Sequence, residues 1–475
     1  MQSSRPCFRQ LGAWIFGAHL LLGVFALEFA PFVEPRAWWW IAPFCIVSLT
    51  MLGYLVYRSL SAEPAGILYE SGLFLSISCA VYYGFGPLLF VIGPVDAADY
   101  ARSWYPLNAT ESIWLTGLNF IGLGLTGLVY VYARFPLLVK IADRAARRWA
   151  SVSPVRVLLA FLLIGLVAKY LFVVPFELGL TKSVPSAVAS DSSQLLVVAI
   201  LVGWIYKDVG PQWIGALVNL LLLTEVTIGI LLFNKTEVLI GIMAAGLGSF
   251  FSQRRFRDLL LTALVGFLIY VLIGPLVDFG RNELTYQGGG QPAPASLSQR
   301  YDIAVTYFAG SESHRRQQEI LGAWWARLNY LPPQQAAVDL YDEGRGSDDL
   351  SRALWIFVPR LLFPGKPTMS DAGVNLTEKV TGRRNSSTGI GVFVDGYYML
   401  GWFGVLLASI TYGVSLRAYS AIARSVVARR AFVMYPLAFI GIFAGLRSDG
   451  WWLIDVAGPT VIVLVLLGLF RLFRP

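Results

Sequence analysis

The chain has 475 residues, of which 56% are hydrophobic and only 14% charged, and its mean hydropathy is +0.63. A soluble domain carries about a quarter charged residues, so this composition excludes a soluble protein and predicts an all-α polytopic membrane protein. The net charge of +8 could indicate nucleic acid, but basic residues in membrane proteins ordinarily follow topology. We therefore expect no nucleic-acid partner.

Patterns typical of disulfide-rich proteins, metal sites and soluble enzymes are missing from the sequence. Cys7 lies in the basic N-terminal tail, and Cys45 and Cys79 lie in apolar runs, so the cysteines form no disulfide framework. The two histidines, His19 and His314, exclude a site built from a histidine cluster. Phosphate-binding loops, GxSxG, HExxH and dinucleotide fingerprints are also absent. We expect neither a metal nor a cofactor.

Apolar runs long enough to cross a membrane recur along the chain. A hydrocarbon core about 30 Å thick requires about 20 apolar residues per helix, and this length predicts about twelve transmembrane helices. They lie near 11–31, 37–57, 66–93, 112–132, 155–177, 194–206, 212–233, 236–251, 258–277, 397–417, 432–446 and 451–470. The sixth, eighth and eleventh are short. The first is interpreted as a span and not as a cleaved signal peptide.

A long polar block separates the ninth and tenth predicted spans. Residues 278–396 hold almost half of the 29 acidic residues and about a third of the 37 basic ones. We therefore divide the chain into helices 1–9 (1–277), a large, partly helical polar loop (278–396) and helices 10–12 (397–475). In so apolar a chain, this block is the place to look for chemistry.

Two helical segments are expected inside the polar block. Apolar residues recur at helical spacing over 300–329, and Pro332 and Pro333 are expected to end that helix. A second helical piece is expected near 348–357. The acidic pairs at 342–343 and 348–349 are interpreted as solvated surface.

The distribution of basic residues predicts the orientation, because cytoplasmic loops carry the excess of Lys and Arg. Segments on the side of the N-terminus hold nineteen basic residues. The short loops on the other side hold five, which are Arg36, Arg102, Lys182, Lys235 and Arg447. This asymmetry places both termini in the cytoplasm and the polar block outside. Residues 133–151 mix basic and apolar side chains and are expected to form an amphipathic helix on the inner leaflet.

Several cations are expected at the outer face of the membrane. Lys235 and Arg447 each stand in a very short outer turn, where a basic residue runs against the topology rule. The others are Arg281, just past the ninth span, and Arg360, Lys366 and Arg383. Nucleotides are not available outside the cytoplasm, so a group transfer there would need an already activated donor, such as one held in the membrane by a lipid diphosphate. The charge that develops on a departing diphosphate needs stabilising, so these residues are candidate substrate-binding groups, with Arg447 acting on the leaving group. The alternative is that each cation contacts phospholipid headgroups.

Carboxylates near the membrane are candidate general bases for an acceptor hydroxyl. Asp395 is the first candidate, because it enters the tenth span beside two tyrosines, and Glu283 is the second. Asp302 and Asp449 also lie near predicted membrane entry points. Helix capping is the alternative role for Asp395.

Short motifs in the second half of the chain carry a family resemblance. They are Val358-Pro359-Arg360 with Phe363-Pro364-Gly365-Lys366-Pro367, then Ser387-Thr388-Gly389, then Asp395-Gly396-Tyr397-Tyr398-Met399-Leu400-Gly401-Trp402-Phe403-Gly404. With many spans, one large loop in the C-terminal half and Arg447 between the last two spans, the chain resembles bacterial oligosaccharide repeat-unit polymerases. These are the Wzy-type O-antigen and exopolysaccharide polymerases. Members often carry a Gly-x-Arg pattern at an outer turn, where this chain has Asn234-Lys235-Thr236, and Lys lacks the bidentate fork of Arg.

The resemblance implies an enzyme of the bacterial inner membrane. It would transfer a growing glycan from undecaprenyl diphosphate to a new lipid-linked repeat unit at the periplasmic face, without metal or nucleotide. The expected partners are the lipid-linked oligosaccharide, the bilayer and a protein that regulates chain length.

Two alternatives stay open from the sequence. An O-antigen ligase would use a similar donor and hand the glycan to a lipid acceptor. A transporter or flippase of lipid-linked saccharides should have charges buried within its spans. Lys169 and Glu225 lie within spans and are expected to pair inside the helix bundle as a structural contact.

Overall fold

The computed structural model describes residues 7–181, 185–287, 295–309, 323–352, 355, 363, 372–382 and 388–473. Every regular element in these ranges is a helix, and no strand occurs in them. Ten helices of the described part are long and apolar enough to cross a membrane. The composition therefore predicted the class correctly, and the chain is a multi-pass, all-α membrane protein.

The ten candidate spans coincide with ten of the twelve predicted ones. They are Phe8–Phe32, Trp38–Ala62, Ser71–Ile92, Ala109–Tyr132, Pro154–Glu177, Val188–Tyr206, Trp213–Leu231, Phe256–Leu284, Val392–Ala428 and Leu453–Leu472. The two remaining predicted spans also form helices, α13 (Lys235–Gln253) and the shorter apolar helix Phe432–Leu446, which are not among the ten. Both belong to the three runs that the sequence marks as short.

The helices group into two compact units. The first contains Met1–Ala145, Trp325–Ser425 and Ile440–Arg474, and the second contains Ala146–Trp324 and Val426–Phe439. Within the polar block 278–396, the grouping changes after residue 324, so its two parts belong to different units. α7 (Pro136–Trp149) and α22 (Tyr435–Leu446) begin in one unit and end in the other. α7 is the amphipathic helix that the basic and apolar pattern predicts.

The first unit is built on long apolar helices packed closely through glycines. Its helices are α1 (Cys7–Phe29), α2 (Ile41–Ala62), α3 (Ser71–Cys79), α4 (Leu89–Ile92), α5 (Val95–Trp104), α6 (Ala109–Tyr132), α18 (Leu331–Asp342), α19 (Asp349–Arg352), α20 (Ala372–Thr381), α21 (Val392–Ala428) and α23 (Gly458–Leu472). A Cβ at Gly124 of α6 would lie 2.8 Å from the carbonyl oxygen of Phe16 in α1. Only glycine permits such a close approach of two helix backbones, which strengthens van der Waals packing in a lipid environment.

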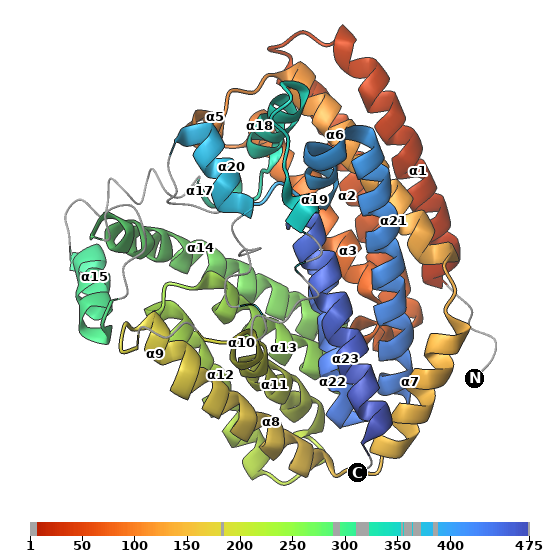
Figure 1. Cartoon of the computed structure of the whole chain (residues 1–475), viewed down its shortest axis with the longest axis vertical. Helices are drawn as coiled ribbons and strands as arrows, with labels where there is room; N and C mark the ends of the chain where they lie inside the picture. Colours follow the sequence, from red (N-terminus) through yellow and green to blue (C-terminus); the bar gives the residue numbers. More distant parts are fainter. Residues whose placement is uncertain are drawn as a thin grey trace. The chain divides into compact units, whose positions relative to one another are not determined.

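Three of the shorter helices, α5, α18 and α20, gather at one end of the long helices of this unit (Figure 1). The expectation that Pro332 and Pro333 end a helix is wrong, because they lie in the first turn of α18. Proline suits this position, since the first N–H groups of a helix have no partner within it. Gln334 fixes α18 by accepting a hydrogen bond from Asn119 of α6 at 2.9 Å and donating to Ile390 O at 2.8 Å.

The predicted tenth span is broken near its start. Within α21 the backbone leaves the helical conformation at Leu400 and Gly401, and Gly401 has φ +61° and ψ −146°. A Cβ on Gly404 would lie 1.8 Å from Gly396 O, so the pieces before and after the break pack backbone to backbone. The segment that holds Asp395 is therefore a short helix of its own, and the long helix follows it.

The second unit holds seven helices of more than six residues together with short helical turns. They are α8 (Pro154–Ala168), the π-helical turn η6 (Lys169–Val173), α9 (Val174–Glu177), α10 (Ala187–Ser193), α11 (Leu195–Tyr206), α12 (Trp213–Leu231), α13, α14 (Phe256–Gln287) and α15 (Leu297–Ala309). α14 runs beyond the predicted end at 277 into the polar block. Leu276 and Leu284 of α14 pack with Ile303 and Tyr307 of α15, which fixes this part of the block.

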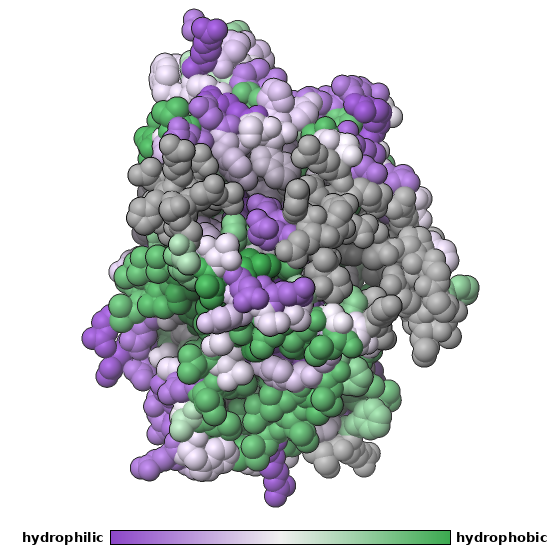
Figure 2. Space-filling view, turned by 90° about the vertical axis from the view of Figure 1, so that its left-hand side faces the viewer, coloured by the Kyte–Doolittle hydropathy of each residue, from purple (hydrophilic) through white to green (hydrophobic). Residues whose placement is uncertain are grey.

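Much of the surface is apolar, as a lipid environment requires. Figure 2 shows broad continuous areas of hydrophobic residues on one face of the molecule. On α14 alone, the exposed side chains include Leu260, Leu261, Leu264, Phe267, Leu268 and Leu272. A soluble monomer rarely exposes such a patch, whereas a membrane-spanning helix does so on its lipid-facing side.

Candidate functional site

The turn that follows α22 is held firmly within the first unit. The hydroxyl of Ser448 lies 2.6 Å from that of Ser78, and Tyr83 donates a hydrogen bond to Ser448 O at 2.7 Å. Tyr83 belongs to η4, a π-helical turn over Ala80–Phe85. Such turns re-aim side chains and often accompany functional sites.

The polar block enters α21 directly against this turn. Gly391 N–H donates to Asp449 O at 3.1 Å, and Val392 N–H donates to Ser448 O at 3.0 Å. A Cβ on Gly389 would lie 2.5 Å from Asp449 O, so that position has no room for a side chain. Two stretches far apart in the sequence, 389–392 and 448–449, are therefore joined backbone to backbone.

Arg447 is anchored on one side and accessible on the other. Its Nη2 lies 3.0 Å from Asp455 Oδ1, and the second carboxylate oxygen of Asp455 accepts a hydrogen bond from Trp451 N–H at 2.7 Å. The side chain of Arg447 keeps 41% of its surface exposed. Burial works against its charge, but the carboxylates of Asp455 and Asp449 outweigh burial and raise the pKa of Arg447. This guanidinium stays charged and can still meet a ligand.

Asp449 lies two residues after Arg447, and its side chain has a different environment. Its Oδ2 accepts a hydrogen bond from the Tyr330 hydroxyl at 3.1 Å, and the Tyr330 ring packs edge-on against Tyr82 at 5.1 Å. Burial raises the pKa of Asp449 above the ordinary aspartate value, although Arg447 and the Tyr330 hydrogen bond work in the opposite direction. A carboxyl with a raised pKa beside a cation and a phenol is suited to proton exchange.

Asp395 is enclosed completely by the first unit. Its side chain has 0% exposure, and its Oδ2 accepts a hydrogen bond from Trp452 N–H at 2.8 Å. Its other carboxyl oxygen has no hydrogen-bond partner among the described residues. The indole of Trp452 in turn donates to Thr411 at 2.8 Å. Asp395 thus fixes the backbone that follows the Arg447 turn.

A polar cavity of about 330 Å³ also lies in the first unit. Its lining includes Ser347, Asp348, Asp349, Asn375, Glu378 and Tyr398. Lys379 also lines it and donates to the Tyr398 hydroxyl at 3.0 Å and to two backbone carbonyls at 3.2 Å each. Asp348 is exposed as predicted, but Asp349 is buried, and its carboxylate accepts a hydrogen bond from Ser347 at 2.8 Å. Hydroxyl, amide, carboxylate and aromatic groups therefore face one space.

Three other predicted site residues lie in the second unit. Lys235 Nζ is 3.0 Å from Asp278 Oδ1 and 5.5 Å from the ring centroid of Tyr270. Arg281 is exposed and its Nε donates to Phe233 O at 2.9 Å. Glu283 is half-buried on α14. The expected meeting of these groups with Arg447 stays a prediction.

Arg360, Lys366 and Arg383 lie outside the described residues. The same holds for most of the first resemblance motif, at 358–367. Among the described residues, no group of three or more His, Cys, Asp or Glu side chains could hold a metal ion.

The predicted pairing of Lys169 with Glu225 is confirmed, and two further residues, Glu237 and Tyr170, join the pair. Lys169 Nζ lies 2.6 Å from Glu225 and 3.0 Å from Glu237, and the Tyr170 hydroxyl donates to Glu225 at 3.1 Å. Glu237 stands in the first turn of α13, where its backbone N–H is capped by Asn234. Glu237 was not predicted as a member of this cluster, because a carboxylate at the start of a helix is ordinarily exposed to water.

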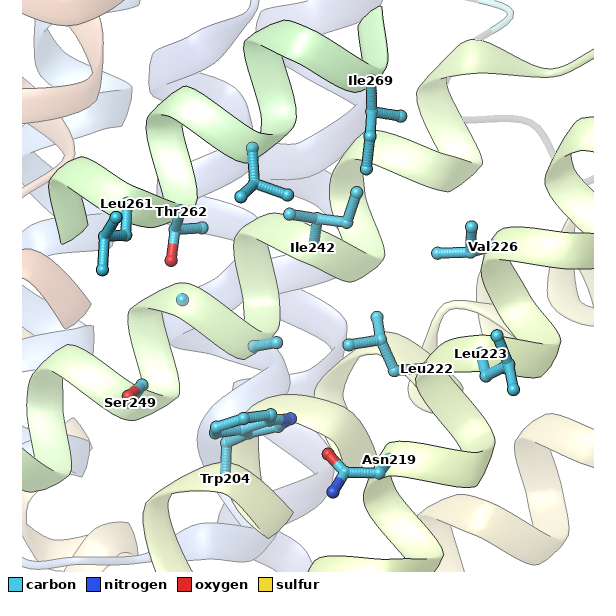
Figure 3. A pocket seen from close by; sticks show the side chains of 13 residues that line it. Trp204, Asn219, Leu222, Leu223, Val226, Ile242, Ser249, Leu261, Thr262 and Ile269 are labelled. Atoms are coloured by element: carbon cyan, nitrogen blue, oxygen red, sulfur yellow. The ribbon is translucent and has the colours of Figure 1, made fainter. Parts of the chain in front are cut away.

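An apolar cavity of about 470 Å³ lies between the helices α11 to α14 of the second unit (Figure 3). Trp204 and Asn219 face it from α11 and α12, and Thr262 faces it from α14. None of the side chains that line it is charged. It offers space for an apolar group and no titratable chemistry.

Comparisons of the chain with protein-family models, curated proteins and solved structures found no match in any of the three.

Proposed function

We propose that the chain is a polysaccharide polymerase of the bacterial inner membrane that uses a lipid-linked donor. It would transfer a glycan from undecaprenyl diphosphate to the non-reducing end of another lipid-linked repeat unit. In this proposal twelve helices span the membrane, both termini are cytoplasmic and the polar block faces the periplasm. The support is the resemblance in layout and motifs, together with the site at the root of that block.

The proposal rests on one observation: a cation and a carboxyl lie two residues apart in the turn that follows α22. Arg447 supplies an anchored and partly exposed cation, and Asp449 supplies a carboxyl whose pKa is raised. The turn that carries both residues is joined to the start of α21 by backbone hydrogen bonds to Ser448 and Asp449. A glycosyl transfer needs a base for the acceptor and a cation for the leaving group, and this turn offers both.

In the proposed transfer one bond forms and one breaks at the anomeric carbon, and no cofactor takes part. The ionised Asp449 takes the proton of the acceptor hydroxyl, whose oxygen forms a bond to the anomeric carbon of the donor. The bond from that carbon to the diphosphate oxygen breaks, and its electron pair leaves with the lipid diphosphate. Arg447 stabilises the charge that develops on the departing diphosphate.

The structure favours a change of role for the leading candidate base. Asp395 is wholly enclosed and fixes Trp452 N–H, so we assign it to positioning and assign proton transfer to Asp449. Glu283, in the second unit, is the remaining candidate base. The cavity lined by Asn375, Glu378 and Tyr398 has groups suited to sugar hydroxyls and supports an acceptor site there.

Reconstitution tests the proposal directly. Purified protein in liposomes is given a synthetic polyprenyl-diphosphate oligosaccharide, and products are separated by length. We expect a ladder of longer glycans and release of free lipid diphosphate. Donor of unchanged length in the presence of correctly folded protein would overturn the polymerase.

The same assay separates the two alternatives. A ligase would leave the donor unextended and transfer it once when a lipid A core acceptor is added. A flippase would move the donor between leaflets without changing its length. The buried pair of Lys169 and Glu225, which the half-buried Glu237 joins, is the feature that favours transport, since charged groups inside spans commonly mark ion pathways.

A further inference from the structure

An open trough of about 670 Å³ runs between α1 and α6 of the first unit. Ala13, Gly17 and Ala18 of α1 contribute its small residues. A Cβ on Gly17 would have no atom within 4 Å, so the space beside it is open. The trough is independent of the site around Arg447 and of the proposed function.

Two arginines stand at the same end of this trough. Arg9 lies in the first turns of α1, and Arg134 comes two residues after α6 ends. A Cβ on Gly12 of α1 would lie 3.4 Å from Val131 of α6, and one on Gly23 would lie 2.8 Å from Gly117 O, so the two helices run antiparallel and the start of α1 lies beside the end of α6. Neither guanidinium forms an ion pair with a carboxylate of the described residues. Burial raises the pKa of the Glu70 carboxyl and the positive charge of Arg9 lowers it, but no ion pair joins the two side chains. The Glu70 carboxylate instead accepts a hydrogen bond from Tyr130 and lies 3.9 Å from Arg417.

Apart from Gln10, the rest of the trough is lined by apolar and aromatic residues and faces outward. Trp14 and Leu21 of α1 are 81% and 73% exposed, and Tyr132 of α6 is 68% exposed. The twelve helical steps from Arg9 to Leu21 cover about 18 Å at the helical rise of about 1.5 Å per residue. This distance is close to one leaflet of a hydrocarbon core about 30 Å thick.

We propose that the trough binds one anionic phospholipid. Its phosphate lies between Arg9 and Arg134, and one acyl chain lies along the open side of Gly17 toward Leu21. Trp14 and Tyr132 flank the upper part of the chain, where amphipathic rings are favoured at the membrane interface. The two cations select an anionic headgroup over a zwitterionic one, and the small residues give the acyl chain its space.

Lipid retention on the purified full-length protein tests this site. The protein is delipidated in mild detergent and titrated with phosphatidylglycerol or phosphatidylcholine, and bound lipid is counted by native mass spectrometry. We expect one tightly retained phosphatidylglycerol and no equivalent retention of phosphatidylcholine. The double variant Arg9→Gln/Arg134→Gln should bind phosphatidylglycerol about twenty-five-fold more weakly, since each basic residue adds roughly a factor of five near an anionic lipid.

Two further variants test whether retention of the lipid requires the trough itself or only positive charge on the protein. Gly17→Leu fills the trough and keeps both arginines, and it should also lose the retained lipid. The control Arg58→Gln/Lys140→Gln removes two exposed cations outside the trough and should retain it. Inorganic phosphate should not compete, because it lacks an acyl chain. Equal loss in the control, full retention in Gly17→Leu, competition by phosphate, or equal retention of phosphatidylcholine would each overturn the proposal.

Discussion

Arg447 and Asp455 form an ion pair of 3.0 Å across the start of the last membrane helix, and the pair leaves part of the guanidinium exposed. Asp455 is itself fixed by Trp451 N–H. The arginine is therefore preorganised without being enclosed. This arrangement distinguishes it from Arg424, which pairs with Glu63 at 3.1 Å with both side chains about half exposed.

Substitution of Arg447 should affect activity more than stability when the charge is kept. Arg447→Lys retains the charge but loses the planar fork, so we expect glycan extension to fall by about a hundredfold. Extension is measured as the rate of ladder formation, and folding by thermal unfolding in detergent. The control Arg424→Ala removes an exposed pair and should change the extension rate less than twofold. Equal rates for Arg447→Lys and the unaltered protein would remove Arg447 from the chemistry.

The pH dependence of activity should follow Asp449. Burial raises the pKa of this carboxyl, so the fraction ionised, and with it the extension rate, should climb at a pH above the ordinary aspartate range of about 4. Asp449→Asn should abolish extension at every pH. The measurement is the initial rate across pH, and an acidic limb that persists unchanged in active Asp449→Asn protein would contradict this assignment.

Titration of Asp449 should lower the stability of the protein as pH rises, whereas it should raise the extension rate. Because its pKa is higher in the folded protein than in the unfolded chain, Asp449 binds a proton more tightly when folded. Its contribution to stability is therefore full below the unfolded pKa and is lost as pH rises through the folded pKa. Asp449→Asn should flatten this part of the profile of unfolding temperature against pH.

Asp395 should tolerate asparagine if its role is positioning. Asp395→Asn keeps an oxygen that can accept from Trp452 N–H, so we expect near-normal extension and stability. Asp395→Ala leaves that N–H without a partner, at a cost of about 1–3 kcal/mol, and should lower both. Normal folding with complete loss of extension in Asp395→Asn would instead make Asp395 part of the chemistry.

Hydropathy predicted the helical framework well, because the lipid environment imposes a simple length rule on each span. The sequence also marks Arg447 and Asp395 as candidates, since a charge beside an apolar run stands out, and their roles stay predictions. The contact between Tyr330 and Asp449 could not be predicted, because the two residues are 119 positions apart and neither belongs to a periodic pattern. α18 was missed for a related reason, as contacts of Gln334 with other segments stabilise it.

The Lys169 cluster should be important for folding. Removing Lys169 leaves the carboxylates of Glu225 and Glu237 without their shared cation, which costs about 3–5 kcal/mol for a buried group. We expect Lys169→Met to lower the unfolding temperature strongly. Lys169→Met/Glu225→Gln should recover part of the loss, because one of the two charges is removed. If the double variant is no more stable than the single one, the pairing does not explain the loss.

The break in α21 should depend on glycine at one position. Gly401 has φ +61°, and a Cβ there would also lie 2.7 Å from the Tyr341 hydroxyl. Gly401→Ala should therefore destabilise the protein by about 1–3 kcal/mol, through backbone strain and displacement of Tyr341. Gly266→Ala is the matched control, because a Cβ at this position in α14 meets nothing within 4 Å. Alanine there should be neutral or stabilising, since it favours the helix. Thermal unfolding of both variants measures the difference, and equal unfolding temperatures would mean that the chain can pass the break without a glycine.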